Sequence, residues 1–262
     1  MAGTSSVAAL YRYPVKSMLG EDLTAAEIDA RGVTGDRAYA VIDPAENRVG
    51  SAKIPRKWAR LYEFRARYDG INSPPDITFP DGSTVSAGAP DLDARLSAEF
   101  GRELRFVAQK PADLKLEAVK PGLDAVDLLE TVDFPLVNPF FDFAALHIVT
   151  SATLDHLRAL YAEGDFDARR FRPNVVLATP GGTGFLEETW IGKTIAIGDE
   201  VRVRIFMNTH RCAATTLPHH GLPNDPDILR TANKHNAGNV GVYATVERTG
   251  TVRVGDAVEV VG

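Results

Sequence analysis

A single cysteine, with a cation and a hydroxyl close by in the sequence, carries the most specific chemistry in this chain. Cys212 follows His210 and Arg211, and Thr209 precedes them. A neighbouring cation favours the thiolate, the form of cysteine that attacks a substrate or binds a metal. The Thr209 hydroxyl could hydrogen-bond the oxygens of a cofactor. A lone cysteine is also an ordinary small core residue. Local spacing leaves both interpretations open.

A second candidate is a basic run, 169–174, that leads into the apolar stretch 175–177. Pro173 fixes the backbone just before this predicted strand, so we expect Arg172 and Asn174 to point to the same side. A guanidinium and an amide that point together suit a phosphate or the edge of a pterin. A run of charges is also typical of a solvated surface.

Two turns offer further anion-binding groups. Lys16 and Ser17 lie where a predicted strand ends near Gly20, and a lysine, a hydroxyl and a glycine together can hold an anion. Arg37 lies in a Gly-Asp-Arg turn at the start of another strand. We expect Asp36 to form the turn or to pair with an arginine rather than to act as a base. Surface Lys-Ser pairs are common, so the first motif is weak by itself.

Other motifs indicate no hydrolase or nucleotide-binding chemistry. The glycine-rich segment 181–184 lacks the lysine of a phosphate-binding loop, and we interpret it as a flexible turn. The adjacent pair His219 and His220 lacks the spacing of two metal ligands on one face, and we expect it on an exposed loop. The sequence contains no nucleophile elbow and no zinc-binding histidine pair at helical spacing.

Composition restricts the class of protein further. The chain has 262 residues, 44% of them hydrophobic, and can bury a full core as one large or two small domains. The net charge of -6 argues against a nucleic-acid binder. One cysteine cannot form an internal disulfide, a four-cysteine zinc site or an iron–sulfur cluster. Apolar stretches are too short to span a membrane, and the N-terminus lacks targeting features, so we expect a cytoplasmic protein.

The elements predicted to position these residues are mainly strands. In the segment 201–205 the period of two places valines on one face and arginines on the other. Gly198-Asp199 and Gly255-Asp256 are predicted tight turns into strands. The fold class is therefore mostly β with a few helices, α+β. Predicted strands are 6–13, 38–42, 61–68, 175–178, 201–206 and 240–246.

Three helices are expected. The first spans 91–100, with Asp91 as its N-cap and Gly101 as its stop. The second starts near Ser151 and carries leucines on one face. The third follows the cap-and-proline signal Asp225-Pro226. The segment 123–138 is predicted to connect two halves of the chain.

Taken in order, the motifs resemble the MOSC family, named for the C-terminal domain of molybdenum cofactor sulfurase, together with its N-terminal β-barrel partner domain. Any one motif is weak, but seven in the family's order span nearly the whole chain. They are Tyr-Pro-Val-Lys-Ser at 13–17, Gly-Asp-Arg at 35–37, Ser-Ala-Lys at 51–53, Phe-Arg-Pro-Asn at 171–174, Trp-Ile-Gly at 190–192, Arg-Cys at 211–212 and Val-Gly-Asp at 254–256.

This resemblance implies two packed β-barrel-like domains, an N-terminal barrel domain over 1–128 and a MOSC domain over 129–262. It also implies a molybdenum centre on a pyranopterin dithiolene, with Cys212 as the protein's ligand to the metal. Thr150, at the start of the second predicted helix, is a further candidate for the cofactor phosphate. By motif position and proximity, the residues implied to hold the cofactor are Lys16, Ser17, Arg37, Arg172, Asn174, Thr209 and Arg211.

The function implied is an oxidoreductase that reduces N-hydroxylated or other N-oxygenated compounds by oxygen-atom transfer, as the amidoxime-reducing members of the family do. Its electrons would come from a separate flavin, haem or iron–sulfur protein, and no nucleic acid or membrane partner is expected. The alternative is a carrier that binds the molybdenum cofactor, in plain or sulfurated form, without turnover of its own. A metal-free β scaffold with a buried cysteine is the third hypothesis. The loop 217–238 departs from the mitochondrial members, which leaves the substrate open.

Overall fold

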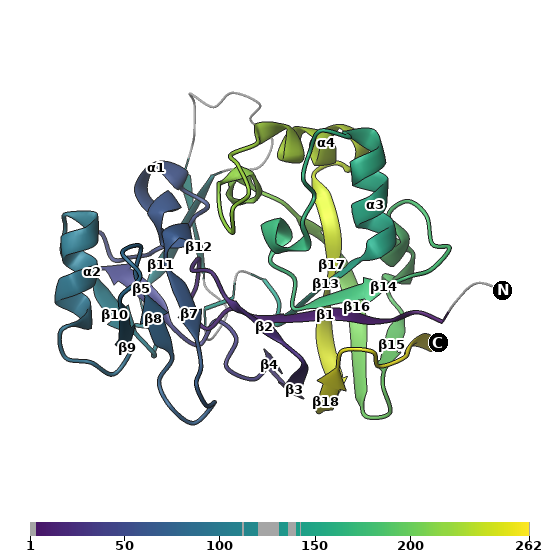
Figure 1. The fold of residues 1–262 in the computed structure, drawn as a ribbon, viewed down its shortest axis with the longest axis horizontal. Helices are drawn as coiled ribbons and strands as arrows, with labels where there is room; N and C mark the ends of the chain where they lie inside the picture. Colours follow the sequence, from purple (N-terminus) through teal and green to yellow (C-terminus); the bar gives the residue numbers. More distant parts are fainter. Residues whose placement is uncertain (1–3, 112, 120–130, 136–139, 142, 262) are drawn as a thin grey trace.

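The computed structural model describes residues 4–111, 113–119, 131–135, 140–141 and 143–261. Figure 1 shows two halves side by side. Most of the early chain, in blue and dark teal, forms the half on the left, and the later chain, in green and yellow, forms the half on the right. The first strand, in purple, lies across the right-hand half. The two ends of the chain are therefore built into one body.

An eight-stranded sheet dominates the right-hand half, with the strand order β19-β15-β16-β17-β13-β14-β1-β2. β13 and β14 pair in parallel, and the other neighbours pair antiparallel. The strands are β1 (Ser6–Arg12), β2 (Glu21–Leu23), β13 (Leu146–Thr150), β14 (Val175–Ala178), β15 (Thr194–Ile197), β16 (Val201–His210), β17 (Asn239–Arg248) and β19 (Val258–Val261).

Three smaller sheets complete the β structure. A five-stranded sheet has the order β10-β5-β6-β11-β12, and two three-stranded sheets have the orders β18-β3-β4 and β7-β8-β9. The strands are β3 (Ala25–Asp29), β4 (Gly32–Val33), β5 (Ala40–Asp43), β6 (Arg48–Val49), β7 (Arg65–Arg67), β8 (Asp76–Thr78), β9 (Thr84–Ser86), β10 (Arg105–Val107), β11 (Lys115–Val119), β12 (Thr131–Pro135) and β18 (Gly250–Arg253). The prediction of a mostly β, α+β fold is confirmed. In the described part of the chain, the strand orders are open and do not close into barrels.

β16 shows how sequence alternation sets the register. Val201, Val203 and Ile205 are buried, while the arginines between them face outward. The strand was predicted to end at residue 206 and instead runs to His210, because the register shifts after Ile205 and the alternation resumes beyond the irregularity. This extension carries Thr209 to the end of the strand, directly before the cysteine motif.

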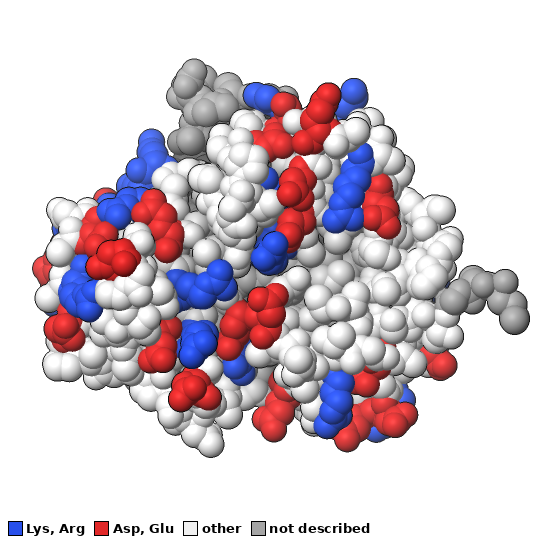
Figure 2. Space-filling view, viewed as in Figure 1, with Lys and Arg blue, Asp and Glu red and all other residues white. Residues whose placement is uncertain are grey.

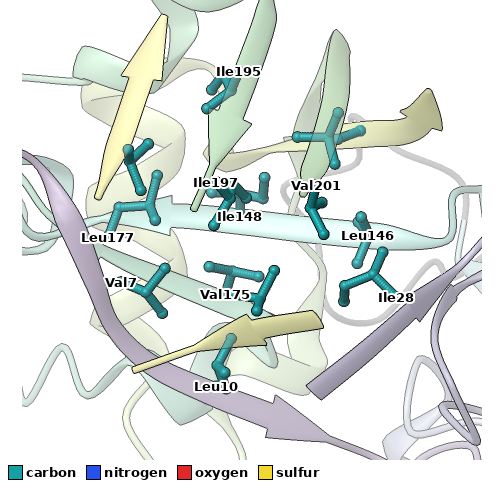
Figure 3. Close-up of a cluster of buried hydrophobic side chains, with 14 of the residues drawn as sticks. Val7, Leu10, Ile28, Leu146, Ile148, Val175, Leu177, Ile195, Ile197 and Val201 are labelled. Carbon is teal, nitrogen blue, oxygen red and sulfur yellow. The ribbon is translucent and has the colours of Figure 1, made fainter. Parts of the chain in front are cut away.

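The main core joins strands from both ends of the chain. In Figure 3, Val7, Leu10 and Ile28 from the N-terminal strands point toward side chains from the C-terminal strands. These side chains are at most 3% exposed. Because burial of each large aliphatic side chain contributes about 1.5–3 kcal/mol, this shared core holds the first strands firmly against the last. The C-terminal members labelled there are Leu146, Ile148, Val175, Leu177, Ile195, Ile197 and Val201.

The three predicted helices are present as α2 (Leu92–Phe100), α3 (Ser151–Leu160) and α4 (Pro226–Asn236). Gly101 ends α2 in the left-handed region at φ 65°, as predicted. Asp91 occupies the N-cap position, but its side chain makes no capping hydrogen bond because its own backbone is already helical. Asp225 does cap α4, accepting a hydrogen bond from the backbone N–H of Asp227. The other helices are α1 (Pro55–Trp58) and the 3₁₀ helices η1 (Ala59–Glu63), η2 (Ala168–Phe171), η3 (Leu186–Trp190) and η4 (Ala213–Thr216).

Two predictions of secondary structure need correction. The strand predicted over 61–68 begins instead as η1, since Leu61 and Tyr62 pack inward as one helical turn, and only Arg65–Arg67 form a strand. The connection predicted over 123–138 contains β12, which pairs with β11. The rest of that segment, 123–130 and 136–138, lies outside the described residues, as does the predicted domain boundary at 128/129. Among the described helices, none has the length and apolar character to cross a bilayer. The cytoplasmic location stays a prediction.

Candidate functional site

Four segments that are far apart in the sequence meet where the two halves join. The Arg172 guanidinium donates from Nη1 to the carbonyl of Met18 at 2.7 Å. Arg37 donates from Nη2 to the carbonyl of Arg172 at 3.3 Å, and Arg211 donates from Nη2 to the carbonyl of Phe171 at 2.6 Å. We call this set of contacts the junction. It brings the motifs at 13–17, 35–37, 171–174 and 211–212 into one place.

The backbone of the junction is strained at three of the predicted site residues. Ser17, Arg37 and Arg172 have φ values of 63°, 48° and 52°. Side chains other than glycine rarely adopt this left-handed region, which costs of order 1 kcal/mol or more per residue. Such strain persists where the surrounding structure enforces it, and it gathers at functional sites. Sequence reasoning places Arg172 at the entrance of a strand, whereas the structure makes it the left-handed end of η2.

Lys16 and Ser17 are both buried at the junction, 5% and 9% exposed. Lys16 donates from Nζ to the carbonyl of Phe140 at 3.1 Å. The Ser17 hydroxyl accepts the backbone N–H of Ala52 at 3.0 Å, which ties in the predicted Ser-Ala-Lys motif. The lysine and the serine therefore lie inside the protein and not on its surface.

Tyr13 is a junction residue that sequence reasoning left unassigned. The guanidinium carbons of Arg172 and Arg37 lie 4.2 and 5.0 Å from the centre of its buried ring. Burial raises its pKa well above the ordinary value, so the phenol keeps its proton. Asp36 accepts the backbone N–H of Tyr13 at 2.7 Å and forms an ion pair with Arg37, which confirms its expected pairing role.

The junction contains buried polar atoms that have no hydrogen-bond partner among the described residues. They are the Tyr13 hydroxyl, Arg172 Nη2, Arg211 Nε and the Thr209 hydroxyl. Leaving such a group unpaired in the interior costs roughly 1–3 kcal/mol, and more for a charged group. All four can donate a hydrogen bond. The arrangement is therefore suited to a ligand that carries several acceptor oxygens or nitrogens and negative charge.

Asn174 and Thr150 differ from this group because the fold itself uses their side chains. The Asn174 amide accepts the backbone N–H of His147 at 3.2 Å and donates to the carbonyl of Tyr11 at 3.4 Å. Thr150 is fully buried, caps α3 and donates to the carboxyl of Glu187 at 2.6 Å. These contacts connect Asn174 to the neighbouring strands and place Thr150 in a separate polar cluster with Glu187.

Cys212 is a free, half-buried cysteine that occupies the N-cap position of η4. Its carbonyl accepts the backbone N–H and the hydroxyl of Thr215, which fixes the turn but leaves the sulfur uncommitted. The buried Tyr62 side chain interacts electrostatically with Cys212. Burial raises the Tyr62 pKa, charge on Arg172 opposes that rise, and charge on Cys212 adds to it. No group of three or more His, Cys, Asp or Glu side chains suited to a metal ion occurs within the described ranges.

The prediction that His219 and His220 lie on an exposed loop is wrong. His219 is only 6% exposed and packs against Tyr62, with ring centroids 5.2 Å apart. His220 is partly buried and accepts a hydrogen bond at Nδ1 from Arg65 at 3.2 Å. The physical reason is that the loop after η4 folds against the N-terminal half, where Leu217 joins a small apolar cluster with Tyr62. Neither contact has a signal in local sequence.

Surface charge around the join is mixed. On the face drawn in Figure 2, Lys and Arg side chains lie among Asp and Glu side chains where the halves meet. Arg12 pairs with Glu21 at 2.8 Å, and Arg169 pairs with Asp167 at 2.6 Å. In the interior of the junction, Arg172 Nη2 and Arg211 Nε have no hydrogen-bond partner among the described residues. A negative ligand would therefore find its complement inside the protein.

Comparisons with known proteins match both halves. The model described as the MOSC N-terminal beta barrel domain matches residues 4–119, and the model described as the MOSC domain matches residues 136–259. Human mitochondrial amidoxime reducing component 2 is 28% identical over 293 residues, with 97% of this chain and 82% of that protein covered. Human mitochondrial amidoxime-reducing component 1 is 24% identical over 293 residues, with 98% and 83% covered.

The fold also has a counterpart among solved structures. The YuaD protein from Bacillus subtilis aligns with a TM-score of 0.50 at 13% sequence identity. The alignment covers 99% of this chain and 97% of that one. At this identity the likeness concerns the fold alone.

Proposed function

Because the chain belongs to the MOSC family, we propose that it is a molybdenum-cofactor-dependent reductase of N-hydroxylated and related N-oxygenated compounds. The relatives named amidoxime reducing components support the reductive chemistry and the substrate class. The single observation that carries the proposal is the set of unpaired donors at the junction, which includes Arg211, the residue directly before the sequence's one cysteine. In a β scaffold with no ligand, these polar groups would be buried without hydrogen-bond partners, which lowers the stability of the folded state.

The junction fits a pyranopterin that bears a phosphate. Arg172 Nη2 and Arg211 Nε supply positive charge together with open donor positions, and the Thr209 hydroxyl adds a neutral donor. Lys16 and Arg37 add charge from the N-terminal half. A ligand with a phosphate and several ring heteroatoms would satisfy donors from both halves of the chain. The remaining residues proposed to hold the cofactor are Ser17 and Asn174, while Thr150 stays a prediction.

The roles of the chain's own residues follow from these positions. Cys212 offers a sulfur held at the start of η4, where a thiolate is a ligand for a soft metal. Arg211 and Arg172 supply positive charge that would neutralise negative charge on the cofactor. The strained backbone at Ser17, Arg37 and Arg172 holds the donors in place before the ligand arrives. When bound, the molybdenum cofactor supplies two-electron, oxygen-accepting chemistry.

The overall reaction needs an external source of electrons. Reduction of an amidoxime to an amidine consumes two electrons and two protons and releases one water. The chain's one cysteine cannot build an iron–sulfur cluster, so we propose that a separate flavin, haem or iron–sulfur protein delivers the electrons.

The test is turnover of the protein produced in a host that makes the cofactor. With reduced methyl viologen as donor, the wild type is expected to convert benzamidoxime to benzamidine and to carry near-stoichiometric molybdenum and pterin. The variant Cys212→Ser is expected to lose at least about 99% of the activity. A wild type that carries the cofactor but reduces no N-oxygenated compound would contradict the reductase proposal. Transfer of the cofactor from that protein to an apo-enzyme would establish the carrier function instead.

A further inference from the structure

His219 is a buried histidine that is not among the residues proposed to hold the cofactor. His219 is only 6% exposed, and neither Nδ1 nor Nε2 has a hydrogen-bond partner among the residues that the structure describes. The other fully buried imidazole, His147, is different, because its Nε2 lies 3.2 Å from the carbonyl of Val240. A buried ring with two open nitrogens is costly unless something else bonds to it.

The loop that carries His219 is held rigidly. Its backbone exchanges two hydrogen bonds with Leu222, at 3.2 and 2.8 Å. Arg170 donates to the carbonyls of Thr215 and Pro223 on either side of the loop. These hydrogen bonds fix the backbone position from which the His219 side chain extends.

The imidazole lies one aromatic ring away from the junction. Tyr62 contacts His219 at 5.2 Å between ring centroids, and the guanidinium carbon of Arg172 lies 5.5 Å from the same Tyr62 ring. Charge on Arg172 acts on both rings. Tyr62 comes from the N-terminal half and His219 from the loop after Cys212, so the contact joins both halves next to the junction.

The chemistry of the ring restricts what it can bind. Burial lowers the pKa of His219 to about 3, so the imidazole is neutral near pH 7. A neutral imidazole presents one donor and one acceptor. The two ring nitrogens point in divergent directions, so one small group can bond to only one of them, and the acceptor nitrogen suits an uncharged hydroxyl donor. The N–O–H group of an N-hydroxylated compound carries such a donor, whereas an N-oxide has acceptors only.

We propose that His219 binds the N–O–H group of the substrate and selects N-hydroxylated compounds over analogues that lack the hydroxyl proton. This inference rests on the proposed function for its ligand class and adds a specificity-determining residue to it. The acceptor nitrogen of the imidazole takes the hydroxyl proton in a hydrogen bond, while the N–H of the ring points away from this group. Tyr62 holds the ring in position through aromatic contact.

The test measures binding without turnover. Calorimetry with the oxidised holoprotein, and with no electron donor present, gives dissociation constants for benzamidoxime and for its O-methyl ether, which lacks only the hydroxyl donor. The variant His219→Phe keeps the aromatic contact with Tyr62 and removes both nitrogens. Comparing two ligands in two proteins cancels the steric effect of the methyl group. His156→Phe is the matched control, because that imidazole also packs edge-on against an aromatic ring, Phe185, at 5.1 Å.

The wild type is expected to prefer benzamidoxime over the ether by about tenfold more than His219→Phe does, which corresponds to about 1.4 kcal/mol for one buried hydrogen bond. His219→Asn is expected to regain part of the preference, and His156→Phe to keep all of it. An unchanged preference in His219→Phe, or no binding of benzamidoxime to the wild type, would overturn the proposal.

Two further readouts separate failure of this inference from other failures. If His219→Phe does not fold, as judged by thermal unfolding and molybdenum content, the imidazole ¹⁵N resonances of the wild type replace it. Benzamidoxime must shift those of His219, and an absence of any shift contradicts the proposal. A holoprotein that binds benzamidoxime through His219 but produces no benzamidine with reduced methyl viologen would refute the reductase function while leaving this binding role intact.

Discussion

Arg170 and Arg172 are two residues apart and lie in regions with opposite hydrogen-bonding character. The Arg170 guanidinium is fully buried, and each of its three nitrogens donates to a backbone carbonyl, those of Asp165, Thr215 and Pro223. We call this region the Arg170 clasp. At the junction, Arg172 donates through Nη1 to the carbonyl of Met18, while its buried Nη2 has no partner among the residues that the structure describes.

This difference in hydrogen bonding indicates that Arg170 has a structural role and Arg172 a ligand-binding role. In the Arg170 clasp the protein supplies every acceptor itself, so the side chain contributes to stability and to the shape of the loop after Cys212. At the junction, Arg172 Nη2 has no acceptor among the described residues, and the backbone is strained at Arg172. A group that is costly without a ligand is suited to bind one. Substitutions in the Arg170 clasp should therefore lower the free energy of unfolding, whereas substitutions at the junction should lower cofactor binding.

The largest expected effect on stability comes from breaking the Arg170 clasp. Arg170→Ala leaves three carbonyls without a donor and opens a void, so the free energy of unfolding is expected to fall by about 3 kcal/mol. Chemical denaturation measures this change. Arg169→Ala is the matched control, since Arg169 forms a partly exposed ion pair with Asp167 and should cost only about 0–1 kcal/mol. Equal losses in the two variants would refute the structural role.

The junction should respond in the opposite manner. Arg172→Gln removes the cation and the open donor but only one internal hydrogen bond, so the free energy of unfolding of the apo-protein is expected to fall by only about 1 kcal/mol. Retained pterin after dialysis, measured by fluorescence, is expected to drop at least about tenfold. A variant with full pterin content and a large loss of stability would show that Arg172 resembles Arg170.

The unpaired His219 is expected to make the free energy of unfolding depend on pH. The folded-state pKa of His219 is about 3, below the ordinary value of 6.5, so its neutral form favours the folded state. Its contribution to stability is present above pH 6.5 and is lost as the pH falls from 6.5 toward 3. In the apo-protein, His219→Phe is therefore expected to lose less stability on acidification than the wild type, as followed by denaturation at several pH values. Parallel curves would contradict this.

The smallest effect is expected in the Glu187 cluster. Burial raises the pKa of Glu187, and hydrogen bonds from the hydroxyls of Thr150 and Thr153 only partly oppose this rise. A raised carboxyl pKa means that the contribution to stability is present below about pH 4.5 and is lost as the pH rises through the folded-state value. Glu187→Gln should therefore gain stability relative to the wild type as the pH increases. A difference that is the same at pH 4 and pH 7 would contradict the raised pKa.

The sequence predicted the elements whose signals are local. α4 has its cap and proline at Asp225-Pro226, α2 has its stop at Gly101, and β16 has its alternation from Val201. Each signal depends on neighbouring residues, so it survives without knowledge of the fold. The register irregularity after Ile205 has no such signal, and the strand was predicted too short.

Features that depend on distant parts of the chain were not predictable in this way. The burial of His219 involves Tyr62, which is more than 150 positions earlier, and β1 pairs with β14, a strand of the C-terminal half. The resemblance to a family named Lys16, Ser17, Arg37 and Arg172, which all lie at the junction, but it gave no reason to select Tyr13. Two arginines over its ring make it part of the site.

The most direct test of the central claim, that the junction binds the molybdenum cofactor beside Cys212, is molybdenum K-edge X-ray absorption on the holoprotein. Wild type and Cys212→Ser are compared after production in the same cofactor-making host. The account predicts that the molybdenum of the variant has one sulfur ligand fewer than that of the wild type. Equal sulfur counts in two loaded proteins, or no bound molybdenum in the wild type, would contradict it.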